Sequence, residues 1–449
     1  MRLLVVGHDQ LPWSSFKAAL FWLESKAVKM TPISDFIQQN EFDRTTSVLI
    51  PTRDAKGGSY CFTILWERTC RLSCLDPRDR IYALLSLLPK RESEGVLPDY
   101  EKPTEDVYKS FILNQIEKSS SLEILRLCSP TSPQSRLDLP SWVPDLTNRN
   151  LPAFQYENAT GTSFPEATFD KLNDTLCVRG ISHGSIAEVR ASIAHSAQLR
   201  EILAVCKTWV PENLRTADYK GGESLLEAFV KTLVCGSIEG VVPAIAGHGL
   251  NLKESAEAFD KSVVKGIVDV TTSSYVDMLR YFLSGRAFFT SEKAFMGICP
   301  SYAEAGDHIV FILGSAPLVL RSVPGRNDRF RVIGECYVQG LMSLEVFAGS
   351  LPDGWRSKTA SIDGFDKLVF VDRSGNQTQM DPRLGALPQD WTFKFGSEYP
   401  LKDSEIDEKG DLRSMWFVHS DGTLQCQDPR LTSELLKTRG VDIQDFILV

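Results

Sequence analysis

The sequence predicts an α+β protein in which helical segments come first and short β-strands follow. Before residue 285, apolar residues recur at helical spacing in several segments, whereas from Arg286 onwards short β-branched and aromatic runs alternate with turns. Residues 351–449 also contain one motif twice, which indicates two small β modules. We expect five regions: 1–150 mainly helical, 151–284 mixed α/β ending in a long helix, 285–350 a small antiparallel β domain, 351–386 a first β module, and 387–449 a second module with the C-terminal tail.

The first region is expected to be helical after a short opening strand. Residues 14–27 are amphipathic, and residues 104–117 begin behind Pro103 with acidic Glu105 and Asp106 in the first turn, where the helix dipole favours negative charge. In the second region, the β-branched stretch VDVTTSS weakens the long helical pattern of residues 253–284 before the strands begin.

Composition and charge exclude several classes of function. The chain of 449 residues is 43% hydrophobic and 24% charged, as is usual for globular proteins, and its net charge of −9 argues against a basic nucleic-acid-binding surface. The longest apolar runs fall short of the roughly 20 residues that a membrane helix needs. The ten cysteines are scattered outside zinc-ligand spacing, and the opening residues do not read as a signal peptide. We therefore expect a cytoplasmic protein with no metal and no cofactor.

One tripeptide, Asp-Pro-Arg, occurs three times, at 76–78, 381–383 and 428–430. At the first site, Asp76 stands where a helix N-cap belongs, Pro77 at the first helical position and Asp79 in the first turn. The other two sites share their flanks: each follows a Leu-Pro-x-x-Trp opening, an aromatic run and a polar turn. The tripeptide is therefore predicted to start a helix once and to close a β module twice.

The chain offers no internal sign of catalysis. Its six histidines are scattered, and it has no phosphate-binding Gly-rich loop, no H-E-x-x-H helix and no EF-hand loop. A nucleophile, a base and an orienting acid would have to converge from distant segments. We predict no catalytic residue from the sequence.

Several phrases resemble the fungal heterokaryon incompatibility (HET) family, in that family's order. They cover most of residues 1–350: CLDPRDRIYALLSLLP (74–89), LPDYEKPTEDVYKSF (97–111), LPSWVPDL (139–146), GRAFFTSEKAFMGICPSYAEAGD (285–307), GSAPLVLRSV (314–323) and GECYVQGLMSLEVF (334–347). The usual acidic ending after Met342 has become Ser343-Leu344. The residues that we assign to these motifs, in structural roles, are Asp76, Pro77, Arg78, Asp79, Trp142, Pro144, Asp145, Gly334, Glu335, Tyr337 and Gly340.

The resemblance implies an interaction protein rather than an enzyme. Members of the family usually begin with a TIR-like α/β domain with SYxWG-, DxxCINQ- and RxWxxQE-type segments, and this chain has none of them. Its opening resembles the segment that follows them, so we expect a truncated relative. If death-inducing activity, such as NAD hydrolysis, resides in that domain, no catalytic residue carries over. We expect the chain to act by interaction in non-self recognition and programmed cell death, either by regulating a full-length relative or as a surviving fragment of one.

The tail resembles two degenerate WW modules, which bind Pro-rich peptides in an aromatic groove. The candidate peptide contacts are Trp355, Phe370, Trp391 and Phe417. Gln379 and Cys426 stand where the second Trp of such modules is usual, which removes a rigid contact surface. Trp355 and Trp391 fit the Trp that packs on the module's own Pro, so the modules are interpreted either as structural or as weak peptide binders.

Two alternatives stay open. One is an enzyme whose site lies in the β domain, with Arg286, Glu292, Asp307 and Glu335 as polar candidates. The other is an accessory protein of a fungal biosynthetic gene cluster, which sequence chemistry does not test.

Overall fold

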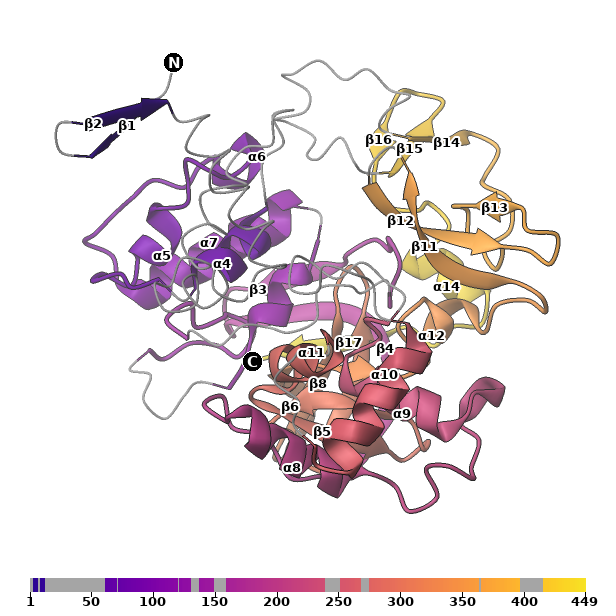
Figure 1. Cartoon of the computed structure of the whole chain (residues 1–449). Helices are drawn as coiled ribbons and strands as arrows, with labels where there is room; N and C mark the ends of the chain where they lie inside the picture. The colour runs from indigo at the N-terminus through magenta and orange to yellow at the C-terminus, as the bar shows by residue number, and fades with distance from the viewer. Residues whose placement is uncertain are drawn as a thin grey trace. The chain divides into compact units, whose positions relative to one another are not determined.

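The computed structural model describes residues 3–6, 9–12, 61–70, 72–119, 121–130, 137–148, 159–238, 251–267, 274–362, 365–395 and 415–449. The fold is α+β, as predicted (Figure 1). The chain divides into two compact units, which are residues 1–101 with 400–412, and residues 102–399 with 413–449. The expected helix over residues 14–27 lies outside the described residues.

The first unit contains a hairpin of β1 (Leu3–Val6) and β2 (Asp9–Pro12) and the short helices α4 (Phe62–Thr69), α5 (Asp79–Tyr82) and α6 (Lys90–Ser93). The carboxylate of Glu92, 1% exposed, accepts the backbone N–H of Phe62 at 3.1 Å. Burial raises the pKa of Glu92, and the contact lies at the start of α4, where a helix has free N–H groups. Glu92 thus anchors the start of α4.

The helix predicted from DPRDRIYALLSLLP is much shorter than its apolar spacing indicates. Only α5 is α-helical, and hydrogen bonds between residues three apart follow, from Leu84 to Ile81 and from Leu87 to Leu84. Ile81 and Leu84 are nevertheless both buried, because a tight 3₁₀-type turn also returns side chains to one side after three residues, and Leu88 is buried four residues further on. The spacing of the apolar residues therefore predicts correctly which side chains are buried, but it predicts too long a helix.

The second unit holds most of the helices. They are α7 (Thr104–Ser119), η1 (Glu123–Leu127), α8 (Leu199–Trp209), η2 (Lys220–Gly222), α9 (Leu225–Leu233), α10 (Leu252–Phe259), η3 (Asp260–Val264), α11 (Ser274–Leu283), α12 (Glu345–Ala348) and α14 (Ser433–Thr438). The prediction of a helix over residues 104–117 is confirmed by α7. The single long helix expected over residues 253–284 is instead α10, the π turn η3 and α11.

A nine-stranded sheet forms the centre of the second unit. Its strands are β3 (Ala167–Asp170), β4 (Thr175–Val189), β5 (Arg286–Ser291), β6 (Met296–Pro300), β7 (His308–Ile312), β8 (Pro317–Val323), β9 (Arg326–Glu335), β10 (Tyr337–Val338) and β17 (Gln444–Leu448). Strands β4, β17, β9, β8 and β7 pair in a closed ring, since β7 also pairs with β4. The register shifts within β4 let its last part leave the ring and pair with β5.

The closed ring uses strands from three of the regions expected from the sequence. β17 pairs antiparallel with β4 and parallel with β9, and Leu448 and Phe446 are 0% and 3% exposed. The backbone of Val449 continues the ladder, since its N–H donates to the Phe330 carbonyl at 2.9 Å and its carbonyl accepts the N–H of Ser141 at 2.9 Å. The tail therefore supplies a central strand of the ring.

Two three-stranded antiparallel sheets lie between β10 and β17 in the sequence. The first contains β11 (Arg356–Ile362), β12 (Phe365–Val371) and β13 (Gln377–Thr378), and the second β14 (Trp391–Phe395), β15 (Met415–His419) and β16 (Leu424–Gln425). We call them module 1 and module 2. They correspond in register, because Phe370 pairs with Thr378 and Phe417 with Gln425. The N–H groups of Trp355 and Trp391 each donate to the carbonyl three residues earlier at 2.9 Å.

All three Asp-Pro-Arg tripeptides adopt one geometry. The Asp carboxylate accepts the backbone N–H of the Arg at 3.0, 2.9 and 2.9 Å and contacts its Nη2 at 2.8, 2.6 and 2.6 Å in Asp76–Arg78, Asp381–Arg383 and Asp428–Arg430. The next residue closes a turn on the Asp carbonyl, as expected for Asp followed by Pro. The tripeptide is therefore a rigid clamp, whether a helix or a loop follows.

Each clamp leaves further guanidinium N–H groups to hold a distant carbonyl. Arg78 donates to Tyr100, Arg383 to Gly349 and Ser343, and Arg430 to Gly385. The side chains of Arg383 and Arg430 are each 3% exposed, against 20% for Arg78. The two later clamps thus hold the ends of the modules through buried arginine side chains.

Arg430→Lys is expected to lower the free energy of unfolding by about 2 kcal/mol, because lysine keeps the charge but loses the two-pronged, buried contact with Asp428. The matched control is Arg78→Lys in the first clamp, whose arginine is 20% exposed, and this change is expected to cost less. Urea denaturation measures both, and equal losses would show that burial does not set the strength of the clamp.

Candidate functional site

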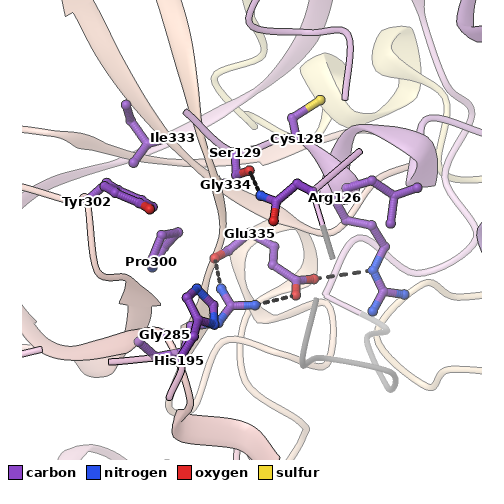
Figure 2. A pocket seen from close by; sticks show the side chains of 13 residues that line it. Arg126, Cys128, Ser129, His195, Gly285, Pro300, Tyr302, Ile333, Gly334 and Glu335 are labelled. Atoms are coloured by element: carbon purple, nitrogen blue, oxygen red, sulfur yellow. Dashed lines mark hydrogen bonds and ion pairs between the residues drawn. The ribbon is translucent and has the colours of Figure 1, made fainter. Parts of the chain in front are cut away.

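A buried cluster of three charged side chains lies where β5, β9 and η1 meet. Glu335, the last residue of β9, has Oε1 2.8 Å from Nη2 of Arg286 and Oε2 3.2 Å from Nε of Arg126 (Figure 2). Arg286, the first residue of β5, also donates Nη1–H to the Glu335 carbonyl at 3.1 Å. The side chains of Glu335, Arg286 and Arg126 are 1%, 8% and 12% exposed. One carboxylate thus ties two strands and a helical turn together.

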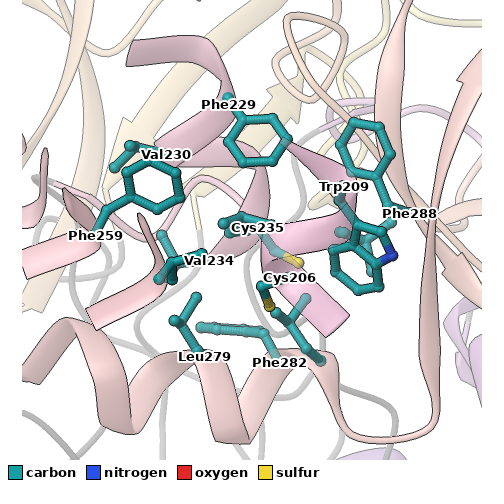
Figure 3. Close-up of a cluster of buried hydrophobic side chains, with 14 of the residues drawn as sticks. Cys206, Trp209, Phe229, Val230, Val234, Cys235, Phe259, Leu279, Phe282 and Phe288 are labelled. Carbon is teal, nitrogen blue, oxygen red and sulfur yellow. The ribbon is translucent and has the colours of Figure 1, made fainter. Parts of the chain in front are cut away.

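An aromatic core beneath β5 positions Arg286. Phe288, two residues along the strand, stacks on Trp209 of α8 at 5.9 Å between ring centroids and packs on Phe229 of α9 at 5.5 Å (Figure 3). Phe229 in turn meets Phe259 of α10 edge-on at 5.7 Å. Each of these helices carries its apolar residues on one side, so three helices fix the strand that carries the guanidinium.

The charged cluster borders a cavity of about 60 Å³. It is lined by Arg126, Leu127, Cys128, Ser129, Asn148, His195, Gly285, Arg286, Pro300, Tyr302, Ile333, Gly334 and Glu335. Gly334 has φ +137° and packs so closely that a Cβ would lie 2.8 Å from Pro300 Cγ, so a side chain does not fit here. The volume is far below the roughly 300 Å³ of ordinary ligand pockets.

The chemistry of this cavity does not favour nucleophilic catalysis. Burial raises the pKa of the Cys128 thiol, which disfavours the thiolate that attacks substrates. Burial, and then the charge of Arg286, lowers the pKa of His195, so its imidazole is neutral at pH 7. Within the described part of the chain, no group of three or more His, Cys, Asp or Glu side chains is placed to hold a metal ion.

The four polar residues that an enzyme site in the β domain would use do not lie together in the structure. Arg286 and Glu335 lie together in the charged cluster. Asp307 is buried elsewhere and contacts Nε of Arg321 at 2.8 Å, and Glu292 is exposed at the end of β5. The sequence did not single out Arg126, because nothing near it in the chain indicates the partner over two hundred residues away.

The remaining motif residues are found in structural surroundings. Trp142 is fully buried and donates Nε1–H to the Asp174 carbonyl at 3.4 Å. Pro144 is buried beside it, and Asp145 accepts the backbone N–H of Thr147 at 2.9 Å. Two further positions lie around β10: Tyr337 is buried with its hydroxyl 2.6 Å from Gln339 Oε1, and Gly340 has φ +84° with open space around it.

A second cavity of about 60 Å³ brings both modules together. We call it the module cavity; it is lined by Gly161, Thr162, Leu344, Leu368, Phe370, Gln379, Met380, Asp381, Leu384, Phe393, Phe417, Asp428, Arg430 and Leu431. Of the four residues predicted to contact a peptide, Phe370 and Phe417 line it, 3% and 2% exposed. Trp355 and Trp391 do not, and are only half-buried.

The partial burial of Trp355 and Trp391 limits what each contributes to the stability of the tail. Trp391 packs against His419 at 4.9 Å between ring centroids, whereas the tryptophan that is nearly fully buried in module 2 is Trp416, at 3%. Complete burial of Trp355 and Trp391 would make each Trp→Ala substitution cost about 3–5 kcal/mol. Because both side chains are only half-buried, each substitution is expected to lower the free energy of unfolding by less than this.

Comparison with known proteins finds two similarities. Residues 252–350 match the Het-6 β-barrel domain. The heterokaryon incompatibility protein 6, OR allele, of Neurospora crassa is 24% identical over an alignment of 335 positions, and the alignment covers 60% of this chain and 48% of that protein. The chain therefore spans about half the length of this curated relative. No solved structure matches the chain significantly.

The matched segment contains most strands of the large sheet, but not all of the strands that close the ring. Strands β5 to β10 lie within residues 252–350, while β4 and β17 come from outside it. Among the described residues, no helix is long and apolar enough to cross a membrane.

Proposed function

We propose that this chain acts in fungal heterokaryon incompatibility by binding another protein, without catalysing a reaction. The match to the Het-6 β-barrel domain and the similarity to the Neurospora protein support the biological setting. The charged cavity supports the non-catalytic part, because the carboxylate of Glu335 is shared by two arginines and burial disfavours the Cys128 thiolate.

The observation that carries a binding role is the meeting of Phe370 and Phe417 at one cavity. These residues occupy corresponding positions in the two modules, and aromatic side chains in pockets dominate the energy of protein interfaces. We propose that the modules are WW-like, with Trp355 and Trp391 in structural roles. The proposed partner is a HET-family relative or a protein with a Pro-rich segment.

The test is co-precipitation of the tagged full chain from fungal extract, with the tag alone as the control. Recovery of a HET-family protein, or of a protein that loses binding when its Pro-rich segment is deleted, is the expected result. Recovery of nothing above the control overturns the binding role. Release of nicotinamide from NAD by the purified chain, abolished by Arg286→Lys, would overturn the non-catalytic part.

A further inference from the structure

The module cavity has one wall from each of the two modules. Leu368 and Phe370 come from β12 in module 1, and Gln379 directly follows β13. Phe393 and Phe417 come from β14 and β15 in module 2. Leu384 and Leu431, which directly follow the two later Asp-Pro-Arg clamps, also line the cavity, and Gly161, Thr162 and Leu344 line it from outside the modules. The clamps therefore help to hold both walls in place.

The charges at the cavity are already balanced. The carboxylates of Asp381 and Asp428 line it, and each is engaged by the guanidinium of its own clamp, at 2.6 Å from Nη2 of Arg383 and of Arg430. A further charged group placed here would be desolvated without a new partner, which is unfavourable. The cavity therefore suits an uncharged occupant.

The side chain of one lining residue, Gln379, has a buried oxygen without a partner among the described residues. The side-chain oxygen Oε1 of Gln379 is buried and accepts no hydrogen bond. A buried acceptor without a donor is uncommon and costs free energy unless something that binds supplies the donor. The occupant should therefore carry an N–H or O–H group beside its apolar part.

The size of the cavity limits the occupant further. A volume of about 60 Å³ is several times the roughly 10–15 Å³ that one water needs by the same measure. It holds about four water-sized groups, the number of heavy atoms in an isobutyl side chain.

We propose that the module cavity is the subsite in which the partner protein of the preceding section inserts one aliphatic side chain from an extended, uncharged segment, with an adjacent backbone N–H donating to Gln379 Oε1. The apolar walls select the side chain, and the lone acceptor sets its orientation. Trp355 and Trp391 do not line this subsite, which distinguishes it from an aromatic groove built on those two residues. This inference rests on the proposed binding function.

The test uses two probes of the same shape, 4-methylpentanamide, which has an N–H donor, and 5-methylhexan-2-one, which has a methyl group in place of the NH2 and no donor. The full chain carries ¹³C-methyl labels on Met and Leu, and the methyl signals of Met380 and Leu384 report binding. Both probes are expected to shift these signals saturably, and the amide should bind about fivefold more tightly, the factor for one net hydrogen bond. Equal affinities, or no saturable shift, overturn the proposal.

Matched variants locate the donor's partner. Gln379→Met removes the acceptor at similar length and should abolish the preference for the amide while both probes still bind. Gln377→Met makes the same change at an exposed position of β13, two residues away, and should leave the preference unchanged. A preference that survives Gln379→Met, or that disappears in Gln377→Met, contradicts the assignment of Gln379.

The probes need no partner, so the two proposals fail separately. If both probes bind as expected and co-precipitation recovers nothing, the subsite stands and the proposed function falls. If a partner is recovered and binds Gln379→Met and wild type equally, the function stands and the subsite is wrong. If the Met380 signal shifts as the concentration of the chain rises, without any probe, then a second copy of this chain occupies the cavity. That result would contradict insertion by a different partner protein.

Discussion

Replacing Leu448 by Asp should unfold the closed ring of strands and lower the free energy of unfolding by about 5 kcal/mol or more. Leu448 is fully buried on β17 and pairs with Leu176 of β4 on one side and Phe330 of β9 on the other. Loss of the leucine packing alone costs about 2–5 kcal/mol, and an unpaired carboxylate in its place adds a desolvation cost. Because the free energy of unfolding of a typical protein is only about 5–15 kcal/mol, this single change removes much or all of it.

Urea denaturation followed by tryptophan fluorescence and circular dichroism measures the loss. The control is Gln444→Asp, which places the same carboxylate at an exposed position of the same strand and should change stability by less than about 0.5 kcal/mol. A Leu448→Asp chain as stable as wild type would mean that β17 is not a member of the ring in solution.

The role of β17 also shows where sequence reasoning stopped. The change from helical to strand period near Arg286 is a local signal, and it correctly indicates strands β5, β7, β8 and β9. The pairing of β17 with β4 and β9 joins residues far apart in the chain, and a run of five residues carries no mark of its neighbours. Such pairing depends on tertiary packing, so the sequence pattern alone predicts a tail separate from the sheet of residues 285–350.

The two sites show the same limit. Arg286 and Glu335 were named from the sequence as polar residues of one region, but Arg126 belongs to the cluster only through the fold. Phe370 and Phe417 were named as equivalent positions in a repeat, which a periodic motif can reveal. Gln379 was noted only as a replacement for an expected tryptophan, and its role as an unpartnered acceptor depends on the burial of one atom.

Glu335→Gln is expected to lower the free energy of unfolding by about 3–5 kcal/mol, because it removes the negative charge that two buried guanidinium groups share. The amide keeps nearly the same shape, so packing around Gly334 and Pro300 is preserved and the loss reports on charge. Glu123→Gln is the control: Glu123 lies 3.8 Å from Nη1 of Arg126 and is 40% exposed, so its loss should cost under about 1 kcal/mol.

A triple variant then separates structural charge from functional charge. Glu335→Met, Arg286→Met and Arg126→Met together replace the cluster by apolar groups of similar length, which is often neutral or stabilising by about 1–4 kcal/mol where the charges serve the fold alone. Recovery of stability with unchanged partner co-precipitation is expected, since the proposed binding surface lies at the modules. A stable triple variant that no longer recovers the partner would move the binding site to the charged cavity, and a triple variant less stable than Glu335→Gln would contradict the purely structural role of the cluster.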